Sequence, residues 1–227
     1  MKLAIILPAY NESKVLADVL KTLPKKITKI DQIQTIVVDD GSADNTFEIA
    51  KKYADYALRH QINLGVGGAT LTGMTFARKI KADIAIVMDS DGQHDSSDIE
   101  KMIQPIVDGK VDITIGSRLI NPKGMPKIKI ITNKIANFIT YLFTGVWVTD
   151  SQTGFRAYSK NALNKIKINT TGYEFCTEIF KELRKNNLKF IEIPIKVIYS
   201  DYSRKKGQSI ANSVNIIIKL LLGSITK

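Results

Sequence analysis

The stretch Ile84-Ala85-Ile86-Val87-Met88-Asp89-Ser90-Asp91-Gly92-Gln93-His94 decides the fold of this chain. Four of its first five residues are bulky and apolar, as a buried parallel strand requires, and the run stops at two acids separated by one residue. Ligands of open α/β sheets gather outside the carboxyl ends of the strands, so Asp89 and Asp91 are expected to face a crevice. Their oxygens suit Mg²⁺ or Mn²⁺ bound together with substrate phosphates. The alternative is a strand-ending turn, because Asp, Ser and Gly are common turn formers.

Length and composition indicate one α/β domain with an appendage. The chain has 227 residues, of which 44% are hydrophobic, enough for one substantial core. The single cysteine, Cys176, excludes an intramolecular disulfide framework and is compatible with a reducing cytoplasm. The apolar run at the N-terminus is too short for a secretory signal and is interpreted as the first strand.

Positive charge is concentrated in the second half of the chain. Residues 1–117 carry 14 Lys and Arg against 16 Asp and Glu, a net charge of −2, whereas residues 118–227 carry 19 against 6, a net charge of +13. This asymmetry indicates an anionic partner for the second half: nucleic acid, an acidic membrane surface or a phosphorylated substrate. A lysine-rich surface that serves solubility alone is the alternative.

From Lys2 to Gly116 short apolar runs alternate with segments of helical period, which predicts βαβ units on a mostly parallel sheet. The predicted strands are residues 3–7, 35–38, 56–59, 84–88 and 113–116. Apolar stripes over 15–23 and 99–106 predict two helices. Ser97 and Glu100 form a capping-box pattern at the start of the second one.

Three further loops fall at predicted strand ends, where a ligand is expected. Pro8 to Glu12 follows the first strand and Asp39 to Ser42 follows the second, and both combine polar groups with turn formers suited to a ribose and a base. Asn63 to Ala69 opens a helix, and its glycines would let a backbone approach a phosphate or sugar. It is neither a Walker A loop nor a dinucleotide fingerprint.

Five motifs in this order carry a resemblance to a known family. They are Pro8-Ala9-Tyr10-Asn11-Glu12, Val38-Asp39-Asp40-Gly41-Ser42, Asn63-x-Gly65-x-Gly67-x-Ala69, Asp89-x-Asp91-Gly92-Gln93-His94 and Gly116-Ser117-Arg118. Together they resemble the family-2 glycosyltransferases of the GT-A fold, above all polyprenyl-phosphate sugar transferases such as dolichyl-phosphate mannose synthase. The resemblance spans about residues 3–209.

The resemblance implies a role for each matching position. The nucleotide sugar would be held by Pro8, Tyr10, Glu12, Asp39, Asn63, Gly65, Gly67, Ala69 and Ser209. Asp89, Asp91 and Gln93 match the positions that hold Mg²⁺ or Mn²⁺ on the donor diphosphate. A cation there would neutralise the charge that develops on the departing nucleoside diphosphate.

The expected catalytic residues are Asp91, Arg118, Asp150 and Arg204. Arg118 matches a phosphate-binding arginine, and Arg204 with Ser209 matches a loop that closes over the donor phosphate. Asp150 falls in the acceptor-side motif Thr149 to Arg156, where relatives that glycosylate a hydroxyl use the acid as a general base. A lipid phosphate is already ionised, so Asp150 would then orient groups. Glu178 is a weaker candidate at the same site.

Two segments are interpreted as membrane-surface helices. Ile128, Ile131, Ile135, Phe138, Ile139 and Leu142 fall at helical spacing, and Val214, Ile217, Ile218, Leu221, Leu222 and Ile225 repeat the pattern. Basic flanks suit the headgroup region, although either helix could instead cover the sheet. The predicted division is a catalytic domain over 1–209, including an interface helix at about 126–144, and an amphipathic helix over 210–227.

The predicted function is that of an inverting glycosyltransferase. It would move a hexose, expected to be mannose, from GDP-mannose or UDP-glucose to a polyprenyl (dolichyl) phosphate. The protein would lie peripherally on the cytoplasmic face of a membrane, where a membrane-embedded partner subunit is possible. The alternatives are a family-2 enzyme acting on a saccharide or protein-linked hydroxyl, and a basic nucleic-acid-binding protein. No zinc-finger or RNA-binding motif supports nucleic acid as a partner.

Overall fold

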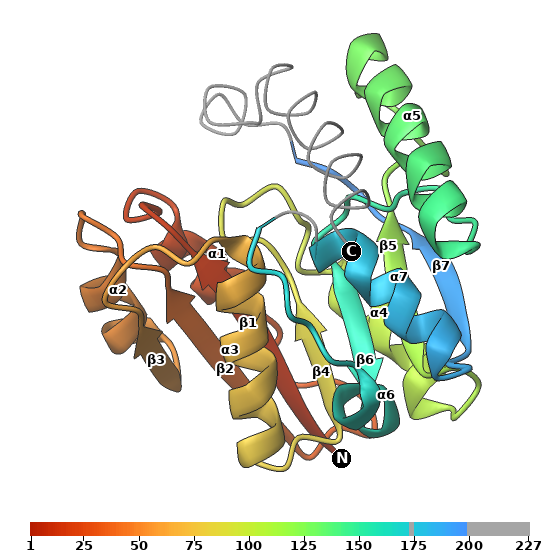
Figure 1. Ribbon diagram of the computed structural model, residues 1–227. Coiled ribbons are helices and arrows are strands. Elements are labelled where there is room, and N and C mark those ends of the chain that lie inside the picture. Colours follow the sequence, from red (N-terminus) through yellow and green to blue (C-terminus); the bar gives the residue numbers. More distant parts are fainter. Residues whose placement is uncertain (173–174, 199–227) are drawn as a thin grey trace.

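Alternating strands and helices form a single mixed sheet in the computed structural model, which describes residues 1–172 and 175–198 (Figure 1). The elements in chain order are β1 (Lys2–Ala9), α1 (Leu16–Thr22), β2 (Gln32–Asp39), α2 (Thr46–Tyr53), β3 (Tyr56–Arg59), α3 (Val66–Lys79), β4 (Ile84–Val87), α4 (Asp98–Val107), β5 (Ile113–Ser117), α5 (Lys127–Thr144), β6 (Arg156–Ser159), α6 (Lys160–Lys165), α7 (Phe175–Lys185) and β7 (Phe190–Pro194). Arg204, Ser209 and the predicted helix over 210–227 lie outside the described residues.

The strand order places a crevice beside the central strand. It is β3-β2-β1-β4-β6-β5-β7, and β6 runs antiparallel to both of its neighbours while the other pairs are parallel. The chain leaves β1 toward β2 and β3, then returns to the opposite side of β1 to form β4. The chain thus reverses its direction along the sheet between β1 and β4, and residues at the carboxyl ends of these two strands line a pocket.

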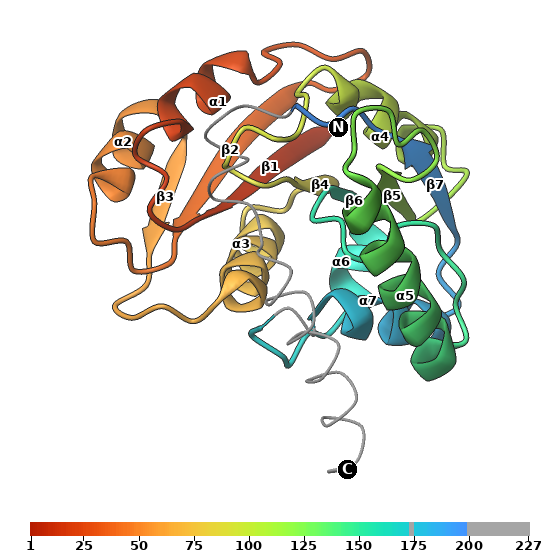
Figure 2. The same cartoon turned by 90° about the horizontal axis from the view of Figure 1, so that it is seen from above.

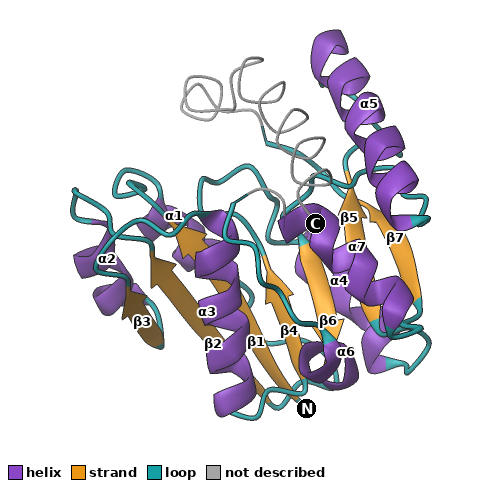
Figure 3. Ribbon diagram, in the orientation of Figure 1, coloured by secondary structure: helices purple, strands orange, loops and turns teal. Residues whose placement is uncertain are grey.

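Two layers of helices bury the two faces of the sheet. α3, α6 and α7 cover one face, and α1, α2 and α4 cover the other (Figures 2 and 3). Side chains of β1 alternate between these layers: Ile6 joins the cluster under α3, while Ile5 and Leu7 join the cluster under α1 and α4. All three side chains are fully buried. The mostly parallel α/β sheet flanked by helices that the sequence predicted is confirmed.

The predicted strands are confirmed, whereas the predicted capping box of α4 is not. Each of the five predicted strands is present, with bounds that differ by up to three residues. The predicted capping box is wrong. α4 begins at Asp98, but Ser97 makes no side-chain cap hydrogen bond. The N–H groups of Asp98 and Ile99 are instead accepted by the backbone carbonyls of Asp95 and Ser96 at 3.0 and 3.1 Å.

Helix α5 presents its bulky residues outward. Five members of the predicted apolar stripe are between 46% and 63% exposed: Ile128, Ile131, Ile135, Phe138 and Leu142. The buried face consists of small or polar residues: Ala136, Asn137, Thr140 and Thr144. The alternative that this stripe covers the sheet is therefore wrong, within the described residues. None of the helices described is long and apolar enough to cross a membrane.

Candidate functional site

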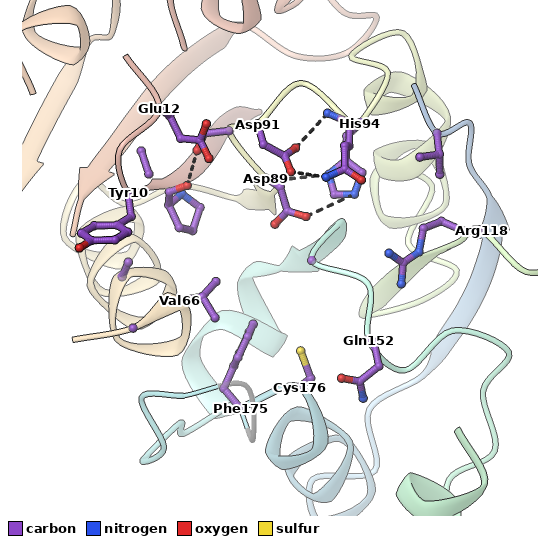
Figure 4. Close-up of a pocket in the computed structure, with 18 of the residues that line it drawn as sticks. Tyr10, Glu12, Val66, Asp89, Asp91, His94, Arg118, Gln152, Phe175 and Cys176 are labelled. Carbon is purple, nitrogen blue, oxygen red and sulfur yellow. Dashed lines mark hydrogen bonds and ion pairs between the residues drawn. The ribbon is translucent and has the colours of Figure 1, made fainter. Parts of the chain in front are cut away.

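A pocket of about 550 Å³ lies at the carboxyl ends of the central strands (Figure 4). Loops after β1, β2 and β4 form one side, and α5 with the loop after β5 forms another. The segment just before β6 and the start of α7 form the floor. The predicted site residues that line it are Pro8, Tyr10, Glu12, Asn63, Gly65, Ala69, Asp89, Asp91, Gln93 and Arg118. Together with Asp40, which also lines the pocket, these residues bring all five sequence motifs to one cavity.

Two carboxylates occupy the end of β4, each held by a nearby residue. The backbone N–H of Asp89 donates to Nδ1 of His94 at 3.1 Å, and Nε2 of His94 lies 3.6 Å from the Asp89 carboxylate. Gln93 donates its backbone N–H to Asp91 at 2.9 Å, and its side-chain amide donates to the same carboxylate. His94 and Gln93 therefore orient the two acids, and Asp89 points into the cavity (Figure 4).

The electrostatics of this pair suit a divalent cation. Burial raises the pKa of Asp89, opposed by Arg118 and Arg156, and burial followed by the charge of Asp89 raises the pKa of Asp91. Two neighbouring carboxylates resist joint ionisation, and a bound cation would reverse that tendency. No group of three or more His, Cys, Asp or Glu side chains is placed to hold a metal in the described part of the chain. The donor set fits Mg²⁺ or Mn²⁺ that completes its coordination with phosphate oxygens.

Gly154 lies directly beneath the first carboxylate. A Cβ atom added at Gly154 would stand 2.4 Å from Oδ1 of Asp89 and 3.1 Å from its Cγ. The next residue, Phe155, stacks on the ring of His94 with ring centroids 4.9 Å apart. The segment that enters β6 therefore leaves room for the carboxylate of Asp89 and supports the imidazole that orients it.

Arg118 is held by a buried carboxylate. Its Nε and Nη2 atoms donate to the two oxygens of Asp150 at 2.6 and 2.7 Å, and its backbone N–H donates to the same residue at 3.0 Å. Asp150 is fully buried, whereas the side chain of Arg118 is 22% exposed and lines the pocket. This bidentate pair fixes the guanidinium plane at the pocket wall. The hydrogen bonds from Asp150 therefore orient the side chain of Arg118.

Asp39, which was predicted to contact the nucleotide, does not line the pocket. Asp39 is fully buried beneath the pocket, where its carboxylate accepts Ser42 N–H at 3.2 Å and lies 3.2 Å from Arg59. Its neighbour Asp40 lines the pocket instead. Asp40 accepts the N–H groups of Leu64 and Gly65 at 2.9 and 2.8 Å, so it ties the loop after β2 to the loop before α3.

The glycines before α3 have a different neighbour from the one expected. A Cβ atom at Gly65 or Gly67 would stand 2.7 Å from the carbonyl oxygen of Thr171. Gly67 is not among the residues that line the pocket, although Gly65 is. The close backbone approach that glycine permits here is therefore made by the chain's own segment 170–172.

Several residues that line the pocket were not predicted from the sequence. Phe175 and Cys176 reach the floor from the start of α7, and Lys129 and Asn133 reach the pocket from α5. Asp40 had a usable signal, because it adjoins Asp39 and successive residues at a strand end point in opposite directions. The helix residues had none, since their place at the pocket depends on packing between distant elements. Glu178 does not line the cavity; its carboxylate instead accepts bonds from the backbone of 169–170.

The fold and the sequence both match known glycosyltransferases. The sheet order and the acidic end of β4 place the chain in the GT-A class of glycosyltransferase folds, as predicted. Residues 4–167 match the family described as Glycosyl transferase family 2, and the chain belongs to that family. The chain is 40% identical to the UDP-N-acetylglucosamine--dolichyl-phosphate N-acetylglucosaminyltransferase of Methanococcus voltae, over 96% of this chain and 94% of the relative.

Two further matches have lower sequence identity. The polyprenol monophosphomannose synthase of Mycolicibacterium smegmatis is 27% identical, over 84% of this chain and 75% of its own length. Among solved structures, glucosyl-3-phosphoglycerate synthase from Mycobacterium tuberculosis in complex with Mn²⁺, UDP and glucosyl-3-phosphoglycerate superposes with a TM-score of 0.69. That match covers 98% of this chain and 79% of the other at 15% identity, so it bears on the fold alone.

Replacing Gly154 by alanine should weaken metal and nucleotide binding more than stability. The added methyl group occupies the space of the Asp89 carboxylate. We expect at least a roughly tenfold loss in Mn²⁺ affinity in the presence of nucleoside diphosphate, measured by Mn²⁺ electron paramagnetic resonance, with little change in Tm. The double variant with Asp89→Ala should bind no more weakly than Asp89→Ala alone. Additive losses would show that Gly154 acts elsewhere.

His94 should make stability depend on pH. Burial lowers the pKa of His94 to about 4, below the value of roughly 6.5 expected in the unfolded chain. Between these values the unfolded chain binds a proton that the folded chain does not, so the free energy of unfolding falls as pH falls from 6.5 to 4. The slope is up to about 1.4 kcal/mol per pH unit. His94→Gln should flatten this dependence in urea unfolding series, and equal slopes would contradict the prediction.

Proposed function

We propose that this protein transfers a sugar, with inversion, from a nucleoside diphosphate sugar to a polyprenyl (dolichyl) phosphate. The proposal rests on one observation: Asp89, Asp91 and Arg118 line the same pocket, and Arg118 is held there by an ion pair with the buried Asp150. The first pair suits a cation bound to a diphosphate, and the second presents a guanidinium fork to a phosphate. Membership in glycosyl transferase family 2 supports an enzyme over a nucleic-acid-binding protein.

The state of Asp150 favours a phosphate acceptor over a hydroxyl. A general base needs a free oxygen near the attacking group. Both oxygens of Asp150 accept bonds from Arg118, and the residue is fully buried. A phosphate monoester already carries the negative oxygen that attacks the anomeric carbon. The chain then has to orient the two phosphate groups rather than remove a proton.

Residues of the pocket take the following proposed roles. Asp89 and Asp91, with Gln93, would hold Mg²⁺ or Mn²⁺, which when bound would neutralise charge on the leaving diphosphate. Tyr10 and Glu12 would contact the nucleoside, and Arg118 would hold phosphate oxygens. Asp39, Asn63, Gly65, Gly67 and Ala69 would shape the nucleotide side of the pocket. Arg204 and Ser209 remain predicted donor-phosphate residues outside the described part.

The relatives favour a different sugar from the one that the sequence resemblance suggested. Mannose was expected, and relatives at 26% and 27% identity are named for mannosyl transfer. The relative at 40% identity is named for transfer of N-acetylglucosamine from UDP. We therefore rank UDP-N-acetylglucosamine ahead of GDP-mannose and UDP-glucose as the donor.

The proposed activity has a direct test. Radiolabelled donors, Mn²⁺ or Mg²⁺ and a short polyprenyl phosphate should give labelled lipid with UDP-N-acetylglucosamine. Asp91→Ala should lower the rate at least roughly a hundredfold, because the leaving diphosphate loses charge stabilisation. Asp31→Ala serves as the matched control, because Asp31 is an exposed acid just before β2, at the end of the strand away from the pocket. Transfer to a saccharide but not to lipid phosphate would overturn the proposal, as would full activity of Asp91→Ala.

We propose further that α5 rests on the membrane that carries the lipid acceptor. Its outward face is apolar, and Lys127, Lys129 and Lys134 lie on the same helix. An apolar face flanked by lysines suits the headgroup region of an anionic bilayer. Its other face lines the pocket through Lys129, Thr132 and Asn133. A lipid phosphate at the bilayer surface would thus lie next to Arg118.

Acidic substitutions on this face should weaken membrane binding. Ile131→Glu combined with Phe138→Glu should lower affinity for vesicles containing phosphatidylglycerol at least roughly tenfold, because the apolar area leaves the bilayer and the added charge is repelled. Cosedimentation measures the change. Tyr53→Glu is a matched control, since Tyr53 is 40% exposed on α2 at the far end of the sheet. Equal binding of both proteins would contradict the proposal.

A further inference from the structure

The buried turn at 149–151 carries Asp150, so the groups that hold this turn also decide where Arg118 points. The segment is neither helix nor strand, and Asp150 and Ser151 are fully buried. Its backbone N–H and C=O groups need partners within the protein, because water cannot supply them. The partners of this turn lie on β7, α5 and β5.

Glu192 on β7 holds the turn from one side. Its Oε1 atom accepts the backbone N–H of Thr149 at 2.7 Å, the hydroxyl of Thr149 at 2.7 Å and the backbone N–H of Asp150 at 3.3 Å. One carboxylate oxygen therefore satisfies three donors. Such convergence fixes both the position and the rotation of the peptide that enters Asp150.

Asn137 on α5 holds the turn from the other side. Its Nδ2 atom donates to the carbonyl of Thr149, and its Oδ1 atom accepts the N–H of Ser151 at 2.8 Å. The side chain is only 4% exposed. The two bonds fall on the residues that flank Asp150, so a single amide side chain spans it as a neighbouring strand would.

A third contact ties the turn to the strand that carries Arg118. The hydroxyl of Thr149 lies 2.7 Å from Oγ of Ser117, the residue before Arg118 at the end of β5. The turn is thus registered against the backbone of Arg118 as well as against its guanidinium. We infer that Glu192 and Asn137 are positioning residues for Arg118, which act through the 149–151 turn and Asp150. This inference rests on the proposed function for the role of Arg118 in transfer.

A purely structural role would look different from a positioning role. If the two side chains only satisfy a buried turn, their loss would lower stability and leave Arg118 in place. If they position Arg118, their loss frees the guanidinium while the apolar core stays intact. Two measurements distinguish these roles: an NMR signal of the Arg118 guanidinium, and the loss of kcat in each variant compared with that of an Arg118 variant.

The experiment uses Glu192→Ala, Glu192→Gln and Asn137→Asp in the full chain. Glutamine keeps an oxygen acceptor, whereas aspartate at 137 cannot donate to the Thr149 carbonyl. Ile191→Ala is the matched control, because Ile191 is 39% exposed on the same strand. The Nε–H signal of Arg118 in ¹⁵N-edited NMR spectra, identified by its loss in Arg118→Lys, reports the ion pair without any substrate.

Glu192→Ala and Asn137→Asp should lose or broaden that signal and lower kcat roughly 10- to 100-fold with a smaller change in KM. Glu192→Gln and Ile191→Ala should keep the signal. In an Arg118→Ala background, Glu192→Ala should cause no further loss of kcat. An unchanged Arg118 signal, or fully additive losses, would overturn the inference. A signal that behaves as expected in a protein without transfer activity would refute the proposed function and leave the positioning role standing.

Discussion

The antiparallel pairing of β6 between β4 and β5 is the constraint on which the site depends. It places Gly154 under the carboxylate of Asp89 and Phe155 against the ring of His94. The same segment begins just after the turn that carries Asp150. One inserted strand therefore joins the acidic strand end, which suits a cation, to the arginine that suits a phosphate. Without this pairing, the segment at Gly154 and Phe155 would not support Asp89 and His94.

The sequence was sufficient for the parts of the fold with strong local patterns. Short apolar runs that alternate with segments of helical period identified five strands, and the family motifs identified most lining residues. β6 and β7 were not predicted, because Arg156 to Ser159 is not an apolar run and Phe190 to Pro194 is short and contains Glu192. Their assignment depends on pairing with distant strands, which no local period encodes.

The orientation of α5 illustrates a second limit of sequence reasoning. Its apolar stripe was correctly located, but a stripe alone does not say whether the sheet or another environment receives it. The deciding feature is the opposite face, where Ala136, Asn137 and Thr140 pack against the protein through small side chains and hydrogen bonds. Polar residues on a buried face look like a solvent face until their partners are known.

That buried face also gives α5 a chemical connection to the pocket. Asn137 reaches the turn that carries Asp150, while the bulky residues of the same helix point away from the protein. In the proposed function, a helix hydrogen-bonded to the turn of Asp150 on one side would meet a lipid surface on the other. The acceptor would then need only its ionised headgroup to reach Arg118. A carboxylate whose two oxygens both accept bonds from an arginine is poorly placed to act as a base, which is why the proposed acceptor is a phosphate, already ionised, rather than a hydroxyl.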